Sequence, residues 1–170
     1  MKPKVIAVVG PTASGKTKLA IELAHKLDGE IVSADSRLVY KGFDIASAKP
    51  TIEEREGVPH HLIDIVEPEY DYSAGKYAED AKCAIDDILS RGKTPIVAGG
   101  TGLYFRVLLE HYNLPKVETD YQLRAELENR EREDLLKELK QLDSITYERV
   151  EDANLRRIVR ALEIIKTLGK

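Results

Sequence analysis

The stretch Gly10-Pro11-Thr12-Ala13-Ser14-Gly15-Lys16-Thr17 decides the fold of this 170-residue chain. It matches the pattern G-x-x-x-x-G-K-[ST], follows the apolar run 5–9, and precedes a run of helical periodicity at 16–27. A glycine-rich turn between a strand and a helix aims backbone N–H groups and the positive end of the helix at an anion. Gly10 and Gly15 permit the necessary backbone angles, Lys16 adds a positive charge, and the Thr17 hydroxyl can ligate Mg²⁺. The stretch therefore predicts a nucleotide or diphosphate site rather than an ordinary turn with a solvated lysine.

Further apolar runs predict the parallel sheet that carries this loop. We expect three more strands, at 30–34, 60–66 and 94–98, and a long amphipathic helix at 73–91. Ligands bind at the carboxyl ends of parallel strands, so Asp35, which follows one of these strands, is expected beside the loop. From the residues alone, Asp35 is equally well explained by a turn in which it caps its own backbone.

The chain changes character after Leu109, where strand signals nearly disappear. Capping-box patterns predict helix starts after Thr51 and at Thr119. Charged segments with helical periodicity lie at 120–131, 134–142 and 154–168. We therefore expect an α/β protein, with a P-loop NTPase-like parallel sheet flanked by helices and a helical appendage. The expected parts are a core at 1–111, a helical insertion at 112–152, and an Arg-rich helix at 153–170 at the junction with the core.

The last predicted helix carries a group of arginines. Arg156 and Arg160 are four residues apart and share a helix face, with Arg157 next to them. Guanidinium groups suit phosphate, but a solvated basic face explains the same pattern. Arg124 and Arg149 could extend a phosphate-contacting patch.

The composition excludes several other classes of protein. The net charge of -4 argues against wholesale coating of nucleic acid, although it is compatible with a local basic face. Cys83 is the only cysteine, so no internal disulfide is possible, and we expect a small core residue in a reducing, cytoplasmic setting. No apolar run approaches the ~20 residues of a membrane helix. His60 and His61 are neighbours on a predicted strand and point to opposite faces, which argues against a metal site there.

Taken in order, the motifs of the chain closely resemble those of the tRNA dimethylallyltransferases, also called tRNA isopentenyltransferases. The shared motifs are 10–17, the D-S-x-x-x-Y segment 35–40, the segment 44–51, G-G-T-G-L-Y at 99–104, and R-A-L-E at 160–163. The resemblance implies transfer of a dimethylallyl group from dimethylallyl diphosphate to N6 of an adenine next to the anticodon of tRNA. It implies Mg²⁺ as the cofactor, the tRNA anticodon stem-loop as the partner, and a cytoplasmic protein, which we expect to be a monomer.

The resemblance also assigns roles to individual residues. Lys16, the loop amides and a Mg²⁺ on Thr17 are expected to stabilise the departing diphosphate. Asp35 is expected to act as general base toward the adenine amine, because a carboxylate with an ordinary pKa can take that proton. Thr101 is expected near the reacting groups. The residues expected to contact tRNA are Asp35, Ser36, Arg37, Leu38, Thr101, Arg124, Arg156, Arg157, Ile158, Val159 and Arg160.

The sequence departs from the family pattern in two places and leaves three rival functions open. Ala46-Ser47 stands where the family usually has Gly-Thr. Members of the family continue beyond the position of Lys170, so a further core strand and basic helices are expected outside this chain. The chain is then expected to be a fragment, a naturally shortened form, or a chain whose site is completed by a second chain. The rivals are a small-molecule P-loop kinase, an adenylate isopentenyltransferase, and a non-catalytic tRNA-binding remnant with an exposed sheet edge. Against a common kinase or ATPase, the strand 94–98 ends in glycines and a threonine rather than an Asp.

Overall fold

The structure is a computed structural model that describes residues 4–11, 13–44, 49–110, 112, 114–115, 117 and 119–169. The chain forms two compact units, Met1–Leu114 and Pro115–Lys170, called here the core unit and the helical unit. Each unit has its own apolar core. The division gives two parts where the sequence suggested three, because the Arg-rich helix packs on the other helices of the helical unit.

A four-stranded parallel sheet forms the centre of the core unit. Its strands lie in the order β1 (Ile6–Val9), β4 (Thr94–Gly99), β2 (Gly29–Ser33) and β3 (His60–His61). The parallel sheet and its crossover helices confirm the predicted fold class. β3 is much shorter than the predicted strand 60–66, because Leu62 and Asp64 adopt positive φ angles of 62° and 57° that end the strand.

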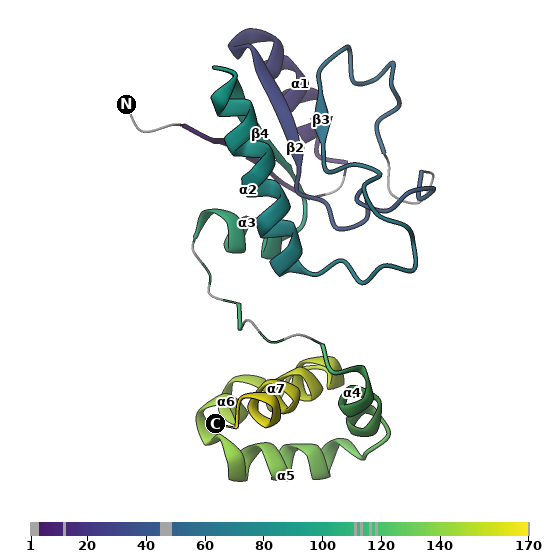
Figure 1. Ribbon diagram of the computed structural model, residues 1–170, viewed down its shortest axis with the longest axis vertical. Coiled ribbons are helices and arrows are strands. Elements are labelled where there is room, and N and C mark those ends of the chain that lie inside the picture. The colour runs from purple at the N-terminus through teal and green to yellow at the C-terminus, as the bar shows by residue number, and fades with distance from the viewer. Residues whose placement is uncertain are drawn as a thin grey trace. The chain divides into compact units, whose positions relative to one another are not determined.

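Helices cover both faces of this sheet (Figure 1). The helices are α1 (Lys16–Leu27), α2 (Ala74–Ser90) and α3 (Gly102–Leu109). Successive strand residues point to opposite faces, so Ile31 packs with α1 whereas Val32 packs with α2 and α3. The parallel stacking of Tyr77 on Tyr104, with centroids 3.8 Å apart, joins α2 to α3. Both faces of β2 are therefore buried, and its carboxyl end is held firmly at the edge where the loop lies.

Two further local expectations for the core unit are wrong. The capping-box bonds at Thr51 do form, with Glu54 N–H donating to Thr51 Oγ1 at 3.2 Å and Thr51 N–H donating to the Glu54 carboxylate at 2.9 Å. Turns follow instead of a helix, and Glu56 has a positive φ of 49° that stops helical propagation. Cys83 is exposed rather than part of the core, because it lies off the face of α2 that packs on the sheet.

The helical unit confirms the predicted helical appendage. It contains α4 (Tyr121–Glu128), α5 (Arg132–Leu142), α6 (Ser144–Val150) and α7 (Leu155–Leu168). The helix predicted to start at Thr119 is capped instead by Asp120, whose Oδ1 accepts a hydrogen bond from Leu123 N–H at 2.9 Å. The core of the helical unit is formed by Leu127, Leu135, Leu139, Ile158, Val159 and Leu162. Among the residues described, no helix is long and apolar enough to span a membrane.

Candidate functional site

The phosphate loop has the shape that its sequence predicts. Gly15 has φ 82° and ψ 6°, a left-handed conformation that suits glycine, and α1 begins at the next residue. Lys16 Nζ donates a hydrogen bond to the Pro11 carbonyl at 2.7 Å, so the lysine lies back over the loop. The first turn of α1 contains no acidic residue, and its free N–H groups keep their attraction for an anion. Thr12 lies outside the described residues, and so do Ile45, Ala46, Ser47 and Ala48 of the segment 44–51.

The turns that follow β2 and β4 are bonded to one another. Thr101 N–H donates to the Ala34 carbonyl at 3.1 Å, and Ser36 N–H donates to Thr101 Oγ1 at 3.0 Å. The Thr101 hydroxyl also donates to Ser36 Oγ at 3.3 Å. A Cβ at Gly99 would lie only 2.1 Å from the Ala34 carbonyl oxygen, so this contact requires glycine. Thr101 therefore fixes the segment that carries Asp35.

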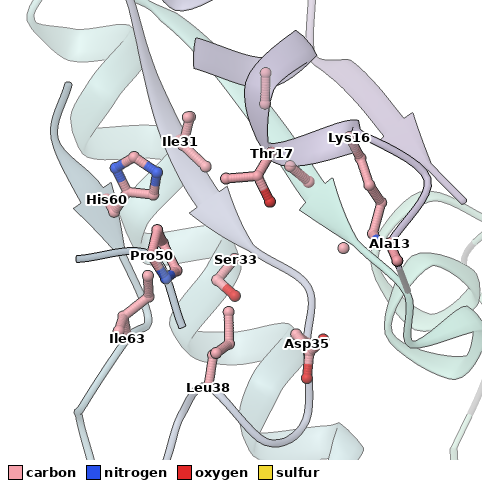
Figure 2. Close-up of a pocket in the computed structure, with 13 residues that line it drawn as sticks. Ala13, Lys16, Thr17, Ile31, Ser33, Asp35, Leu38, Pro50, His60 and Ile63 are labelled. Carbon is pink, nitrogen blue, oxygen red and sulfur yellow. The ribbon is translucent and has the colours of Figure 1, made fainter. Parts of the chain in front are cut away.

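A single pocket joins the phosphate loop to Asp35 (Figure 2). Asp35 Oδ1 accepts a hydrogen bond from Arg37 N–H at 2.9 Å, so the aspartate caps its own turn and also faces the pocket. The two sequence interpretations of this residue are thus compatible. The pocket is lined by Ala13, Lys16, Thr17, Ala20, Ile31, Ser33, Asp35, Leu38, Pro50, His60, Ile63, Ala98 and Gly99.

The pocket also contains two polar groups that the sequence analysis missed. Ser33 Oγ and His60 Nε2 are buried without a hydrogen-bond partner among the described residues. Burial lowers the pKa of His60, and its Nδ1 lies 2.8 Å from the Val58 carbonyl, so the neutral ring presents Nε2 as an acceptor. The one signal in the sequence is a serine that directly follows the apolar residues Ile31 and Val32 of the strand. Both groups are available to a ligand or a bound water.

The neighbouring His61 has a structural role. Its Nε2 lies 2.7 Å from the Glu30 carboxylate, which is buried and is also bound by Arg91 and Lys93. Hydrogen bonds from Arg91 lower the pKa of Glu30 to about 2, against the opposing effect of burial. The described residues contain no group of three or more His, Cys, Asp or Glu side chains suited to a metal ion.

The residues predicted to contact tRNA fall into two sets in two units. In the core unit, Ser36 and Arg37 are exposed beside Asp35, and Leu38 lines the pocket. In the helical unit, Arg156 and Arg157 are exposed on α7.

Four other residues of the predicted tRNA set have structural roles in the helical unit. The side chains of Ile158 and Val159 are buried in its core, so their predicted contact with RNA is wrong as a side-chain contact. Arg124 and Arg160 bind the fully buried Glu163 at 3.0 and 2.8 Å. Burial alone would raise the pKa of Glu163, but the hydrogen bonds from Arg160 and Arg124 outweigh it and lower that pKa.

A parallel sheet whose first strand runs through a glycine-rich loop into α1 defines a protein of the α/β class with a P-loop NTPase-like fold. Sequence profiles identify the family within that class: one described as IPP transferase matches residues 38–170, and one described as isopentenyl transferase matches residues 3–67. The chain belongs to the IPP transferase family, as its motifs predicted.

Named relatives are similar to the chain over nearly its whole length. The tRNA dimethylallyltransferase of Thermomicrobium roseum is 52% identical over 170 residues, which cover 98% of this chain and 52% of that protein. The chain also resembles the crystal structure of the tRNA isopentenylpyrophosphate transferase of Bacillus halodurans, with 43% identity, a TM-score of 0.66, and coverage of 97% of this chain and 56% of that one.

A structure of a eukaryotic dimethylallyltransferase acting on tRNA matches with a TM-score of 0.85 and 34% identity, over 99% of this chain and 43% of that one. The chain thus spans about half the length of the relatives it matches.

Proposed function

We propose that the chain carries the donor site and the base of a tRNA dimethylallyltransferase, which attaches a five-carbon allylic group to N6 of an adenine beside the anticodon. The observation that carries this proposal is that Lys16, Thr17 and Asp35 line one pocket. The names of the relatives support the choice of donor and acceptor, because they describe enzymes that transfer dimethylallyl or isopentenyl groups to tRNA.

The proposed chemistry is a substitution at C1 of the allylic group. The bond from C1 to the diphosphate oxygen breaks, and the electron pair leaves with the diphosphate toward the loop amides and Lys16. The adenine N6 forms the new bond to C1, and Asp35 takes the proton that this nitrogen loses. Thr101 positions Asp35 through its bonds to Ala34 and Ser36.

A magnesium ion fits the donor groups of this pocket. Mg²⁺ is usually held by few protein oxygens together with substrate phosphates. The exposed Thr17 hydroxyl, which lines the same pocket as Asp35, is such a donor. The ion would supply further neutralisation of the diphosphate charge.

The proposed partner is the anticodon stem-loop of tRNA, bound to a monomer in the cytoplasm. Arg37 next to the pocket and Arg156 and Arg157 on α7 are exposed guanidinium groups suited to phosphate contacts. The target base has to leave the loop stack before it can reach Asp35, which costs a few kcal/mol unless the loop is already splayed.

The deciding experiment incubates the 170-residue chain with labelled dimethylallyl diphosphate, Mg²⁺ and an anticodon stem-loop. We expect label in the RNA, a loss of about 10²–10⁴-fold in rate for Asp35→Asn, and diphosphate binding weakened about 10–100-fold for Lys16→Ala. An Asp35→Asn variant that transfers at the parental rate would contradict the base assignment. Label in free AMP would identify an adenylate isopentenyltransferase, and transfer of phosphate from ATP would identify a kinase. Binding of RNA without transfer of the label would identify a non-catalytic remnant.

A further inference from the structure

One lysine ammonium lies buried between two loops beside the pocket. The Lys49 side chain is 6% exposed, and its Nζ contacts the carboxylates of Asp44, at 2.6 Å, and of Asp64. The same ammonium donates to the Tyr40 carbonyl at 3.3 Å. All three of its hydrogen-bonding positions are therefore used, and they join Lys49 to Tyr40 and Asp44 on one loop and to Asp64 on the other.

Each segment held by this ammonium supplies one apolar wall residue of the pocket. Pro50 follows Lys49 directly, and Ile63 precedes Asp64. Asp64 N–H donates to the Leu38 carbonyl at 3.0 Å, so Leu38 is tied to the same point. Leu38, Pro50 and Ile63 thus form a wall, called here the apolar wall, whose parts are joined through Lys49 (Figure 2).

A second lysine in the same loop, Lys41, forms an ordinary surface ion pair. Lys41 pairs with Glu67 at 2.6 Å, with the two side chains 51% and 64% exposed. Such a pair contributes little, since water screens it. Loss of the Lys49 ammonium is different, because it leaves two carboxylates close together with no cation between them, and like charges repel. That repulsion acts to separate the two loops that carry the apolar wall.

We propose that Lys49 is a positioning residue that holds the apolar wall against the alkyl part of the donor. This inference rests on the proposed function, because it takes dimethylallyl diphosphate as the ligand of the pocket. The alkyl group is bonded directly to the diphosphate, so it has to lie in the pocket onto which the phosphate loop opens. The wall that Lys49 organises is a large part of the apolar lining of that pocket, which Ile31 from β2 and Ala20 from α1 extend. The diphosphate itself contacts the loop and not the wall.

The test measures the Kd of two ligands, dimethylallyl diphosphate and inorganic diphosphate, for the full chain with Mg²⁺. For Lys49→Met we expect the Kd of dimethylallyl diphosphate to rise about tenfold, since burial of two methyl groups corresponds to roughly that factor. The Kd of inorganic diphosphate should stay unchanged. Lys49→Arg should recover most of the affinity, and Lys41→Met, the matched control from the same loop, should behave like the parent.

Asp64→Asn provides a second test that keeps the shape of the side chain and the Lys49 cation. We expect the Kd of dimethylallyl diphosphate to rise about threefold and the Kd of inorganic diphosphate to stay unchanged, because part of the attraction between the loops is lost. If Lys49→Met weakened the binding of both ligands equally, or changed neither Kd, the role of Lys49 would be overturned. A parent chain that binds dimethylallyl diphosphate no more tightly than inorganic diphosphate would instead overturn the proposed function, before any variant is compared.

Discussion

Single residues at the carboxyl edge of the sheet hold the site together through contacts that leave no room for a side chain. We expect Gly99→Ala to destabilise the protein by about 1–3 kcal/mol or more, because overpacking of that kind forces the backbone to move. The new Cβ would lie 2.1 Å from the Ala34 carbonyl oxygen. The turns of Asp35 and Thr101 would separate, so transfer should fall as well. Urea denaturation measures the first effect and the labelled-RNA assay the second.

Gly102→Ala is the matched control for this change. Gly102 begins α3 three residues further on, and a Cβ there meets no atom within 4 Å. Its stability should change by no more than about 0.5–1 kcal/mol, in the stabilising direction if at all, because alanine favours a helix over glycine. If the two variants were equally stable, the close contact at Gly99 would not constrain the edge of the sheet.

At the scale of elements, the buried carboxylate of Glu30 ties the start of β2 to the turn between α2 and β4. Its partner Arg91 donates two hydrogen bonds to it and holds its pKa at about 2, below the ordinary 4.5. A depressed pKa in the folded state gives stability that is present above pH 4.5 and lost as the pH falls from 4.5 toward 2. The shift corresponds to about 3 kcal/mol.

We therefore expect Glu30→Gln to flatten the dependence of the free energy of unfolding on pH, measured with urea between pH 3 and 7. The difference from the parent should be largest near pH 7 and smallest near pH 3. Arg91 keeps Asp87 as a partner at 2.7 Å, so the variant leaves no unpaired guanidinium. Glu67→Gln, which removes an exposed pair, should leave the curve close to that of the parent. Parallel curves for Glu30→Gln and the parent would refute the linkage.

The elements that the sequence predicted well are those whose signals are local. The bounds of α1 agree with the predicted 16–27 because loop, periodicity and C-terminal turn all lie within one stretch. β3 was predicted too long, since the positive φ at Leu62 arises from a turn that contacts residues far away along the chain. The seven-residue α6 was not predicted at all, because its short segment carries too few apolar positions to show a period.

The candidate site was predictable in the same uneven way. The apolar runs predicted where the glycine-rich loop and Asp35 lie, because each directly follows such a run, whereas Thr101 was singled out only by the resemblance to the family. The sequence shows a serine in the strand but not that Ser33 Oγ and His60 Nε2 are buried without a hydrogen-bond partner among the described residues, since burial depends on what packs around them. The α7 motif was taken as one RNA-contacting stretch, although the period of the helix places Ile158 in the core and the buried Glu163 binds Arg160.

For the whole molecule, the two units have separate cores, so damage to one core should leave the function of the other unchanged. We expect Leu135→Ala, at a fully buried position of the helical unit, to cost that unit about 2–5 kcal/mol. Urea denaturation should then show an early transition ahead of the main one, because two cores need not unfold together. Binding of inorganic diphosphate to the core unit should stay at the parental Kd.

RNA binding should respond differently from diphosphate binding in the same variant. Arg156 and Arg157 lie on α7, which packs on α5 through the core that contains Leu135. Loosening that core disorders the helix that presents the two guanidinium groups, so the affinity for an anticodon stem-loop should fall, with a weaker dependence on salt as phosphate contacts are lost. Leu142→Ala is the control, because Leu142 lies on α5 like Leu135 but is 50% exposed. This variant should bind both RNA and inorganic diphosphate with the parental affinity. If Leu135→Ala bound RNA with the parental affinity and salt dependence, the arginines of α7 would not be part of the RNA-binding surface, and the helical unit would need another function.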